Sequence, residues 1–188
     1  MYRAYKDYRQ SEEQYIQLLN HVRNNEVTKS DLVLLNSCYQ PDAGKLHDRI
    51  TLTTHNYKAD IINRDELKRL PEPSFQYEAH IEGDFSDKSY PADPVLTLRN
   101  GARVMFIRND SGEERQYYNG RLATVVNLAE EKIEVEFEDT HLRYELKRET
   151  WQNIRYRYNK ESDQVDEDVL GAFSQYPIRL AWAITIHK

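Results

Sequence analysis

Residues 178–188, IRLAWAITIHK, decide the fold of this chain. They form an apolar run, typical of a buried segment, that ends on a hydroxyl, an imidazole and an ammonium group. Nothing follows Lys188 in the sequence, and a domain seldom stops directly on its last buried segment. We therefore expect the natural protein to continue past Lys188, so that these 188 residues form part of a larger protein.

The composition sets the class of protein. A chain of 188 residues forms one large or two small domains, and 39% hydrophobic against 31% charged residues allows only a modest core. The single cysteine, Cys38, cannot form an internal disulfide and fits a reducing compartment. The sequence has no signal peptide and no apolar run long enough to span a bilayer. We therefore expect a cytoplasmic protein without a membrane partner.

Charge is distributed unevenly along the chain, whose net charge is −6. This value argues against nucleic-acid binding over the whole surface, because phosphate binding usually leaves a basic footprint. Residues 144–160 nevertheless hold five basic side chains against two acidic ones, whereas residues 161–168 hold five acidic ones and are interpreted as a solvated loop. Within residues 151–160, Arg155 and Arg157 alternate with tyrosines. This alternation predicts either a nucleic-acid-binding face or an ordinary strand with tyrosines in the core and arginines in water.

The first part of the chain has helical signals. Residues 11–14, SEEQ, form a capping-box pattern, and apolar residues then recur at helical spacing, which predicts a helix over about 12–24. Thr28 or Ser30 can cap a second, short helix. The proline-rich stretch 71–94 indicates a domain boundary.

A polar turn, Thr54-His55-Asn56, separates a short β-branched strand at 50–53 from a helix predicted over 57–70. Proteins of the α/β class place ligands at such strand-to-helix turns, and the amides of a helix N-terminus favour a phosphate. The alternative is that Asn56 is only the N-cap of the helix and that His55 is an ordinary surface residue.

In the C-terminal half the apolar pattern has a period of two, which predicts short strands joined by tight turns. Residues 75–81 are predicted to form one strand, residues 95–98 and 102–108 are predicted to pair with each other, and Asn119-Gly120 marks a hairpin. Five or six strands at this spacing predict a small antiparallel barrel.

Four segments resemble, in the same order, motifs of superfamily-one DNA helicases of the RecD and PIF type. The segments are Tyr8-Arg9-Gln10 with a helix ending at Val22-Arg23 (motif IV), Thr54-His55-Asn56 (a T-H-K triplet in the family), residues 98–109 with Asn119-Gly120 (an inserted SH3-like barrel) and LAWAITIHK at 180–188 (the start of motif V). Asn56 stands where the family has a lysine, so one phosphate-binding cation is absent. Asn63 matches an asparagine of the family's helix, and we expect it to be a buried structural group.

The resemblance implies an α/β fold, in which residues 1–73 and 168–188 form an incomplete RecA-like layer and residues 75–160 form an inserted antiparallel SH3-like β-barrel. It also implies that the chain is a fragment of an ATP-dependent DNA helicase that translocates on single-stranded DNA, with 5′–3′ polarity, and unwinds duplex DNA. The 188 residues contain no Walker A loop and no Walker B motif. ATP and Mg are therefore expected to be bound mainly by the N-terminal motor domain of the same protein, and the fragment alone is expected to be an inactive monomer.

The resemblance further implies roles for individual residues. Arg9, with Gln10 beside it, is expected to act as an arginine finger on the γ-phosphate of ATP, because a guanidinium neutralises charge spread over phosphoryl oxygens. No metal site is expected, because one cysteine and histidines without ligand spacing cannot form a zinc site. The resemblance also implies contacts to DNA from the turn and the last residues: Thr54, His55, Asn56, Thr185, His187 and Lys188. Arg155 and Arg157 are candidate DNA contacts because they alternate with tyrosines, not because of the resemblance.

Two other interpretations stay open. The barrel can belong to a non-catalytic interaction module, SH3-like or Tudor-like, that binds a peptide or a nucleic acid, or the chain can be a structural domain without a ligand. A GxxxxGK[ST] motif before Met1 and SQG after Lys188 in the parent protein would favour the helicase. A salt-dependent titration with single-stranded DNA would separate the structural domain from the two binding proteins.

Overall fold

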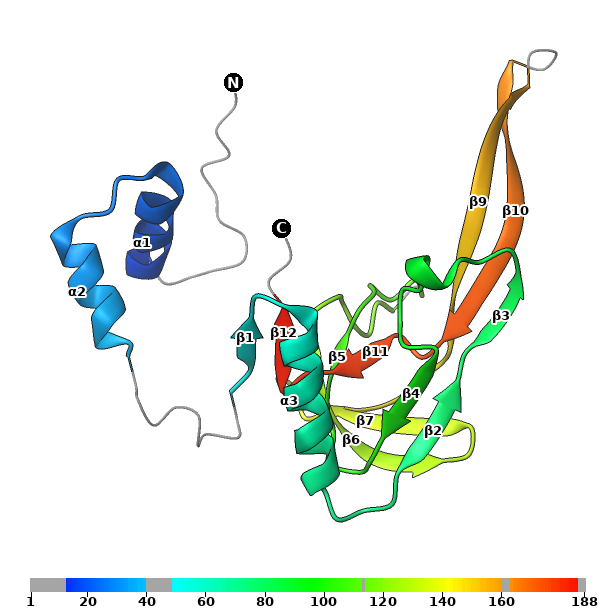
Figure 1. Ribbon diagram of the computed structural model, residues 1–188, viewed down its shortest axis with the longest axis horizontal. Coiled ribbons are helices and arrows are strands. Elements are labelled where there is room, and N and C mark those ends of the chain that lie inside the picture. Colours follow the sequence, from blue (N-terminus) through cyan, green and yellow to red (C-terminus); the bar gives the residue numbers. More distant parts are fainter. Residues whose placement is uncertain (1–12, 40–48, 113, 160–162, 186–188) are drawn as a thin grey trace. The chain divides into compact units, whose positions relative to one another are not determined.

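The computed structural model describes residues 13–39, 49–112, 114–159 and 163–185 (Figure 1). The chain divides into two compact units, Met1–His47 and Asp48–Lys188, which are described separately. Four of the residues predicted to be functional lie outside the described residues: Arg9, Gln10, His187 and Lys188.

The N-terminal unit contains two helices, α1 (Glu13–Asn24) and α2 (Lys29–Ser37), which confirms both predicted helices. Thr28 caps α2 in a reciprocal arrangement with Asp31, because the Thr28 amide donates to Asp31 Oδ2 at 2.7 Å and the Asp31 amide donates to Thr28 Oγ1 at 3.2 Å. His21 of α1 contributes a ring nitrogen 2.9 Å from the same carboxylate. These hydrogen bonds, with those of Thr28 first, hold the pKa of Asp31 below its ordinary value.

The second unit begins with a small α/β layer. Strand β1 (Thr51–Thr53) pairs in parallel with β12 (Ala183–Thr185), and helix α3 (Asn56–Arg69) packs against β12. The predicted strand at 50–53 and the predicted helix at 57–70 are therefore confirmed within one residue at each end. Two strands separated by some 130 positions in the sequence thus lie side by side.

Asn63 fixes α3 against β12. Its side-chain amide donates to the Ala183 carbonyl at 2.8 Å, and the Ala183 amide donates back to Asn63 Oδ1 at 2.8 Å. The same side-chain amide also lies 3.4 Å from the Leu180 carbonyl. Asn63 is buried, with 5% of its surface exposed, and its polar atoms take the place that a neighbouring strand would have beside β12. The expectation that Asn63 is a buried structural group is confirmed.

The rest of the second unit is mostly sheet. Its fold is mixed α/β, and the strands of its described part form several small sheets rather than a closed ring. A short 3-10 helix, Asp87–Ser89, lies between β3 and β4. A two-stranded sheet consists of β2 (Phe75–Glu78) and β4 (Val95–Leu98). A three-stranded sheet consists, in spatial order, of β3 (His80–Gly83), β10 (Gln164–Gln175) and β9 (Glu149–Asn159). A five-stranded sheet consists, in spatial order, of β11 (Ile178–Leu180), β5 (Arg103–Phe106), β6 (Leu122–Ala129), β7 (Lys132–Phe137) and β8 (Arg143–Glu145).

The hydrophobic core lies against the five-stranded sheet. In β7 the predicted alternation is confirmed, because Ile133, Val135 and Phe137 are buried and the charged residues between them are partly exposed. Phe106 of β5 stacks on Tyr117 with ring centroids 4.3 Å apart. The core also includes residues from α3, β4, β6 and β11: Leu67, Leu96, Leu98, Val125 and Ile178.

Two predicted strand arrangements are wrong. Residues 75–81 form two strands rather than one, because the Ala79 amide donates to the Pro94 carbonyl at 2.8 Å and the chain then changes its partner from β4 to β10. Residues 95–98 pair with β2 and not with residues 102–108. Alternation alone fixes which face of a strand is buried but not which strand lies beside it, so this pairing could not be derived from it.

The acidic run after residue 163 is also not a loop. Residues from Gln164 onward belong to β10, which pairs with β9 to form a long antiparallel hairpin (Figure 1). Asp166 lies opposite Arg157, and Asp168 lies opposite Arg155. Opposite charges on facing strands stabilise the pairing, which explains why so acidic a segment adopts a strand.

Candidate nucleic-acid interface

The candidate site lies where β1 and β12 end. Because the strands are parallel and Thr53 is in register with Thr185, their carboxyl ends meet at the same edge. The turn Thr54-His55-Asn56 follows β1 at this edge, and its three residues are exposed, whereas Thr185 is partly buried. The structure therefore brings together two segments that the sequence analysis assigned to DNA contact, in the position where open α/β sheets bind ligands.

Hydrogen bonds order the turn. The Thr53 hydroxyl donates to the His55 carbonyl at 3.1 Å and lies 3.5 Å from the Ile184 carbonyl of β12. Thr54 Oγ1 and His55 Nδ1 are 2.8 Å apart, and the His55 ring lies 5.6 Å from the ring of Tyr57. The turn thus presents a hydroxyl, an imidazole and an aromatic ring together on the surface.

The N-terminus of α3 starts within this turn. His55 is the capping residue, with an extended backbone (φ −136°, ψ 134°), and its side chain makes no capping hydrogen bond. Asn56 is the first helical residue, so the alternative in which Asn56 is the N-cap is wrong. Backbone amides in the first turn of a helix carry partial positive charge and attract anions. This arrangement can bind a phosphate even though Asn56 replaces a lysine.

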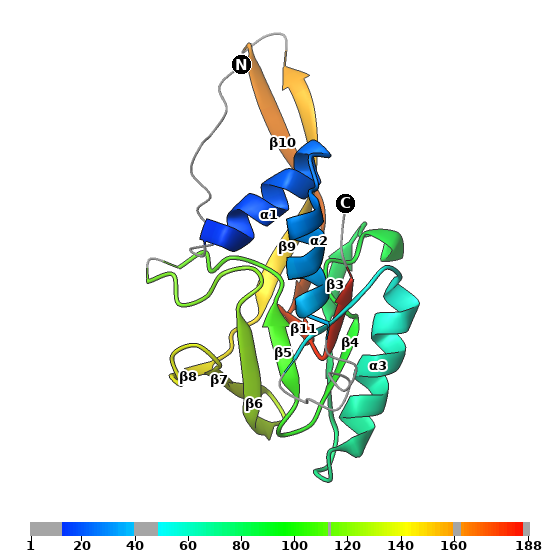
Figure 2. The same ribbon diagram turned by 90° about the vertical axis from the view of Figure 1, so that its left-hand side faces the viewer.

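The arginines of β9 lie on a different part of the unit. The hairpin of β9 and β10 projects beyond the rest of this unit in both views (Figures 1 and 2). Arg155 and Arg157 are exposed, but each faces an aspartate across the hairpin. Tyr156 and Tyr158 are also exposed, by 64% and 58%, so the alternative in which the tyrosines of this strand lie in the core is wrong.

Tyr57 was missed by the sequence analysis. It is 58% exposed and directly follows the turn, on the first turn of α3. The signal was available in the count of fourteen tyrosines in 188 residues, which exceeds what a modest core can bury.

Neither a metal centre nor a membrane segment is found in the described part of the chain. No group of three or more His, Cys, Asp or Glu side chains there is placed to hold a metal ion. None of the helices described is long and apolar enough to cross a membrane.

No family model matches this sequence. Among characterised proteins, the ATP-dependent DNA helicase PIF1 of Danio rerio is 31% identical over 96% of this chain and 28% of its own length. The ATP-dependent DNA helicase Pif1 of Psychrobacter sp. (strain PRwf-1) is 28% identical over 91% of this chain and 32% of its own length. Unliganded Pif1 from Bacteroides sp. superposes with a TM-score of 0.85 and 35% identity, over 96% of this chain and 41% of that one.

The chain is similar in sequence and fold to Pif1 helicases over more than nine-tenths of its length. This confirms the resemblance inferred from the four sequence segments. Bacteroides Pif1 bound to single-stranded DNA also matches, with a TM-score of 0.68 and 35% identity over 96% of this chain and 41% of that one. The chain spans about a third of the length of the curated Pif1 relatives, 32% and 28% in the two compared above.

Proposed function

We propose that this chain is part of an ATP-dependent DNA helicase of the Pif1 type, which translocates 5′–3′ on single-stranded DNA and unwinds duplex DNA. The observation that carries the proposal is the shared edge of β1 and β12, where the turn at 54–56 meets Thr185. The relatives, which match more than nine-tenths of the chain, are named as ATP-dependent DNA helicases. The interaction module and the structural domain have no comparable support.

At this edge, a backbone phosphate of the strand is bound by the first-turn amides of α3, with the hydroxyl of Thr54 and the ring of His55 beside it. Asn56 and Thr185 add neutral hydrogen-bonding groups, and His187 and Lys188 continue the contact. Because position 56 is not a lysine, the helix terminus rather than a side chain of the turn supplies the positive charge beside this phosphate.

The hairpin forms a second DNA contact in this proposal. Tyr156 and Tyr158 are exposed aromatic rings on which bases can stack, and stacking does not depend on sequence. Arg155 and Arg157 contribute less to phosphate binding than unpaired arginines would, because each faces an aspartate across the hairpin.

Arg9 and Gln10 act at the ATP site, where the γ-phosphate and Mg are held mainly by the N-terminal motor domain. Their role rests on the motif that they share with the family, because both lie outside the described residues. A guanidinium at this position neutralises the charge that develops on the phosphoryl oxygens.

The domain organisation in this proposal has residues 1–73 and 168–188 in the second RecA-like motor domain and residues 75–160 in an inserted SH3-like barrel. The small α/β layer of β1, β12 and α3 supports the first assignment. Four strands of the open five-stranded sheet, β5, β6, β7 and β8, fall within the barrel assignment, whereas its edge strand β11 falls within residues 168–188. A cytoplasmic location and a monomeric state stay predictions, the former supported by the free, exposed thiol of Cys38.

The test is Arg9→Ala in the full-length protein. We expect DNA-stimulated ATP turnover to be abolished while binding to single-stranded DNA is retained, because the arginine acts on the phosphoryl group and not on the strand. Turnover equal to that of the unmodified protein would remove Arg9 from the mechanism. Lys29→Ala, which removes an exposed cation of the same unit that lies outside the motif, serves as the matched control.

A further inference from the structure

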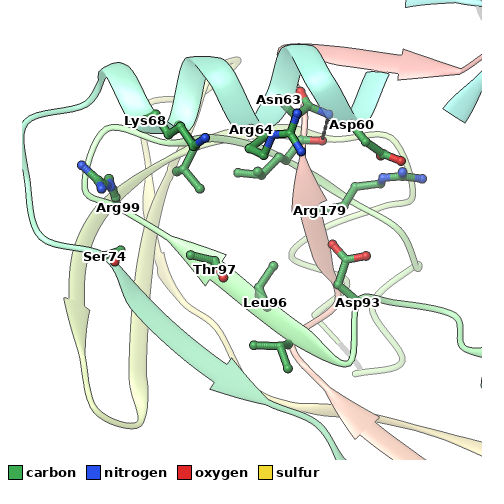
Figure 3. A pocket seen from close by; sticks show the side chains of 13 residues that line it. Asp60, Asn63, Arg64, Lys68, Ser74, Asp93, Leu96, Thr97, Arg99 and Arg179 are labelled. Carbon is green, nitrogen blue, oxygen red and sulfur yellow. Dashed lines mark hydrogen bonds between the residues drawn. The ribbon is translucent and has the colours of Figure 1, made fainter. Parts of the chain in front are cut away.

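A cavity of about 520 Å³ lies between α3 and the strands β4 and β11 (Figure 3). Its lining from α3 begins at Asp60, after the turn at 54–56. This volume falls within the range of about 300–1,000 Å³ that is usual for small-molecule sites. The cavity takes no part in the strand contact proposed above, and the elements that line it all belong to the unit Asp48–Lys188.

The cavity is cationic although the chain is acidic. It is lined by four basic side chains and two acidic ones, a balance of +2, whereas the whole chain carries −6. Lys68 and Arg99 lie at one end, and Asp60 and Asp93 lie at the other with Arg179 between them (Figure 3). A ligand that fits this distribution is anionic at one end and donates hydrogen bonds at the other.

Helix geometry explains the separation of charge along α3. Asp60, Arg64 and Lys68 are four residues apart, so they follow one another along one face of the helix. From Asp60 to Lys68 the helix rises by about 12 Å. The carboxylate therefore lies two turns away from the ammonium group, with the Arg64 guanidinium between them.

Arg99 completes the cationic end. It follows β4, and its guanidinium donates to the Leu70 carbonyl, just past the end of α3, at 2.6 Å. This bond fixes the direction of the guanidinium and uses one of its five N–H donors. A guanidinium held in this way is prepared to bind the oxygens of a phosphate.

The floor of the cavity is apolar. Leu67 and Leu96 are buried beneath it, and Val95, which is 46% exposed, forms an apolar wall. A flat ring placed against Val95 would remove apolar surface from water, which favours binding.

The opposite end can recognise hydrogen-bond donors. The Asp93 carboxyl points into the cavity (Figure 3). Asp93 as a whole is exposed, but desolvation of its carboxyl raises its pKa, an effect opposed by Arg179 and reinforced by Asp60. Asp and Glu side chains accept hydrogen bonds from the exocyclic amino group of cytosine. The two carboxyls suit a base that carries such a group.

We propose that this cavity binds a nucleoside phosphate, with its phosphate between Arg64, Lys68 and Arg99 and with the amino edge of its base toward Asp60 and Asp93. The ligand is either a free nucleotide or a nucleotide unit of a DNA strand, since both present the same chemistry. An acidic peptide satisfies the cationic end but not the carboxylate end, so the observations favour the nucleotide.

The test is a calorimetric titration of the 188-residue chain with deoxycytidine monophosphate, a ligand without the β- and γ-phosphates that a motor site uses. In the double variant Lys68→Ala/Arg99→Ala we expect the affinity to fall about tenfold or more, because two charged hydrogen-bonding partners of the phosphate are lost. Deoxycytidine, which has no phosphate, is expected to bind weakly and equally to both proteins. Arg69→Ala, adjacent on α3 but outside the cavity lining, is the matched control and should leave the affinity unchanged.

A second arm tests the base. Asp60→Asn should weaken the binding of deoxycytidine monophosphate and not that of thymidine monophosphate, which has no exocyclic amino group. A third arm adds an oligonucleotide of ten deoxycytidines as a competitor of deoxycytidine monophosphate, so that only binding at the cavity is measured. Displacement of deoxycytidine monophosphate identifies a strand as the source, and the absence of displacement identifies the free nucleotide.

The proposal is overturned if the unmodified chain does not bind deoxycytidine monophosphate at millimolar concentration. It is also overturned if binding is the same in Lys68→Ala/Arg99→Ala, with circular dichroism showing that both proteins are folded, or if only an acidic peptide competes for the cavity. None of these results bears on Arg9 or on the edge of β1 and β12.

Discussion

The hydrogen bonds between Asn63 and Ala183 give a quantitative expectation for Asn63→Ala. The substitution leaves the buried N–H and C=O of Ala183 without the partners that each has at 2.8 Å. An unsatisfied buried polar group costs about 1–3 kcal/mol, so for these two groups we expect the free energy of unfolding to fall by about 2–6 kcal/mol.

Urea-induced unfolding followed by tryptophan fluorescence measures this change, because both tryptophans, Trp151 and Trp182, lie in the unit that contains Asn63. Asn127→Ala is the matched control, since Asn127 is exposed on β6 and its loss should change stability by no more than about 0.5 kcal/mol. Asn63→Asp tests the chemistry further. A carboxylate can still accept from the Ala183 amide but cannot donate to the Ala183 carbonyl, so it should also destabilise the protein. A loss in Asn63→Ala as small as that in Asn127→Ala would refute the role of Asn63.

Two further expectations concern other surfaces. Tyr156→Ala/Tyr158→Ala in the full-length protein should weaken binding to single-stranded DNA by about 1–3 kcal/mol per stacked base, measured by fluorescence anisotropy, with Tyr118→Ala as an exposed control; equal affinity would exclude the hairpin from the contact. Asp31 should titrate below its ordinary pKa of 3.8 in carbon-detected NMR, and Thr28→Val should raise that pKa toward 3.8. Because folding lowers this pKa, the stabilisation is present above pH 3.8 and is lost as the pH falls through the folded value; a pKa unaffected by Thr28→Val would contradict the capping argument.

The small α/β layer was predictable because local signals and the family motif agreed. The β-branched residues at 50–53, the helical spacing after them and the prolines at 71 and 73 define a strand and a helix without tertiary information. The parallel pairing of β1 with β12, in contrast, could not be predicted from local signals. Only the order of motifs in the family indicated that the turn at 54–56 and the segment at 180–188 belong together, because no periodicity relates segments so far apart.

The hairpin shows where charge and alternation mislead. Five acidic residues among the eight at 161–168 favour a solvated loop when considered alone, but two of them, Asp166 and Asp168, lie opposite arginines of β9. Alternating Tyr156 and Tyr158 indicate a common face, but burial of that face requires another layer. The hairpin of β9 and β10 extends beyond the rest of its unit (Figure 1), and Tyr156 and Tyr158 are exposed.

The cavity could be predicted only in part. The spacing of Asp60, Arg64 and Lys68 places one carboxylate and two cations on one helical face, which the sequence shows directly. The remaining wall comes from β4, β11 and the segment before β4, and its position depends on β4 pairing with β2. The sequence predicted that residues 95–98 pair with residues 102–108, which is wrong. A fold built on that pairing could not have placed Arg99 in the wall of the cavity.

Helix α3 links the two surfaces, and Asn63 lies between them. The turn at its N-terminus forms the edge with β12, while the face from Asp60 to Lys68 lines the cavity. Because Asn63 both lines the cavity and holds β12, its loss should loosen both surfaces together. Lys68 is more than three turns from the start of the helix, so its loss should affect the cavity alone. Comparing Asn63→Ala with Lys68→Ala in the full-length protein therefore separates a defect in the common framework from a defect in one site. If Lys68→Ala weakened the contact at the turn as much as Asn63→Ala did, the two surfaces would not be independent.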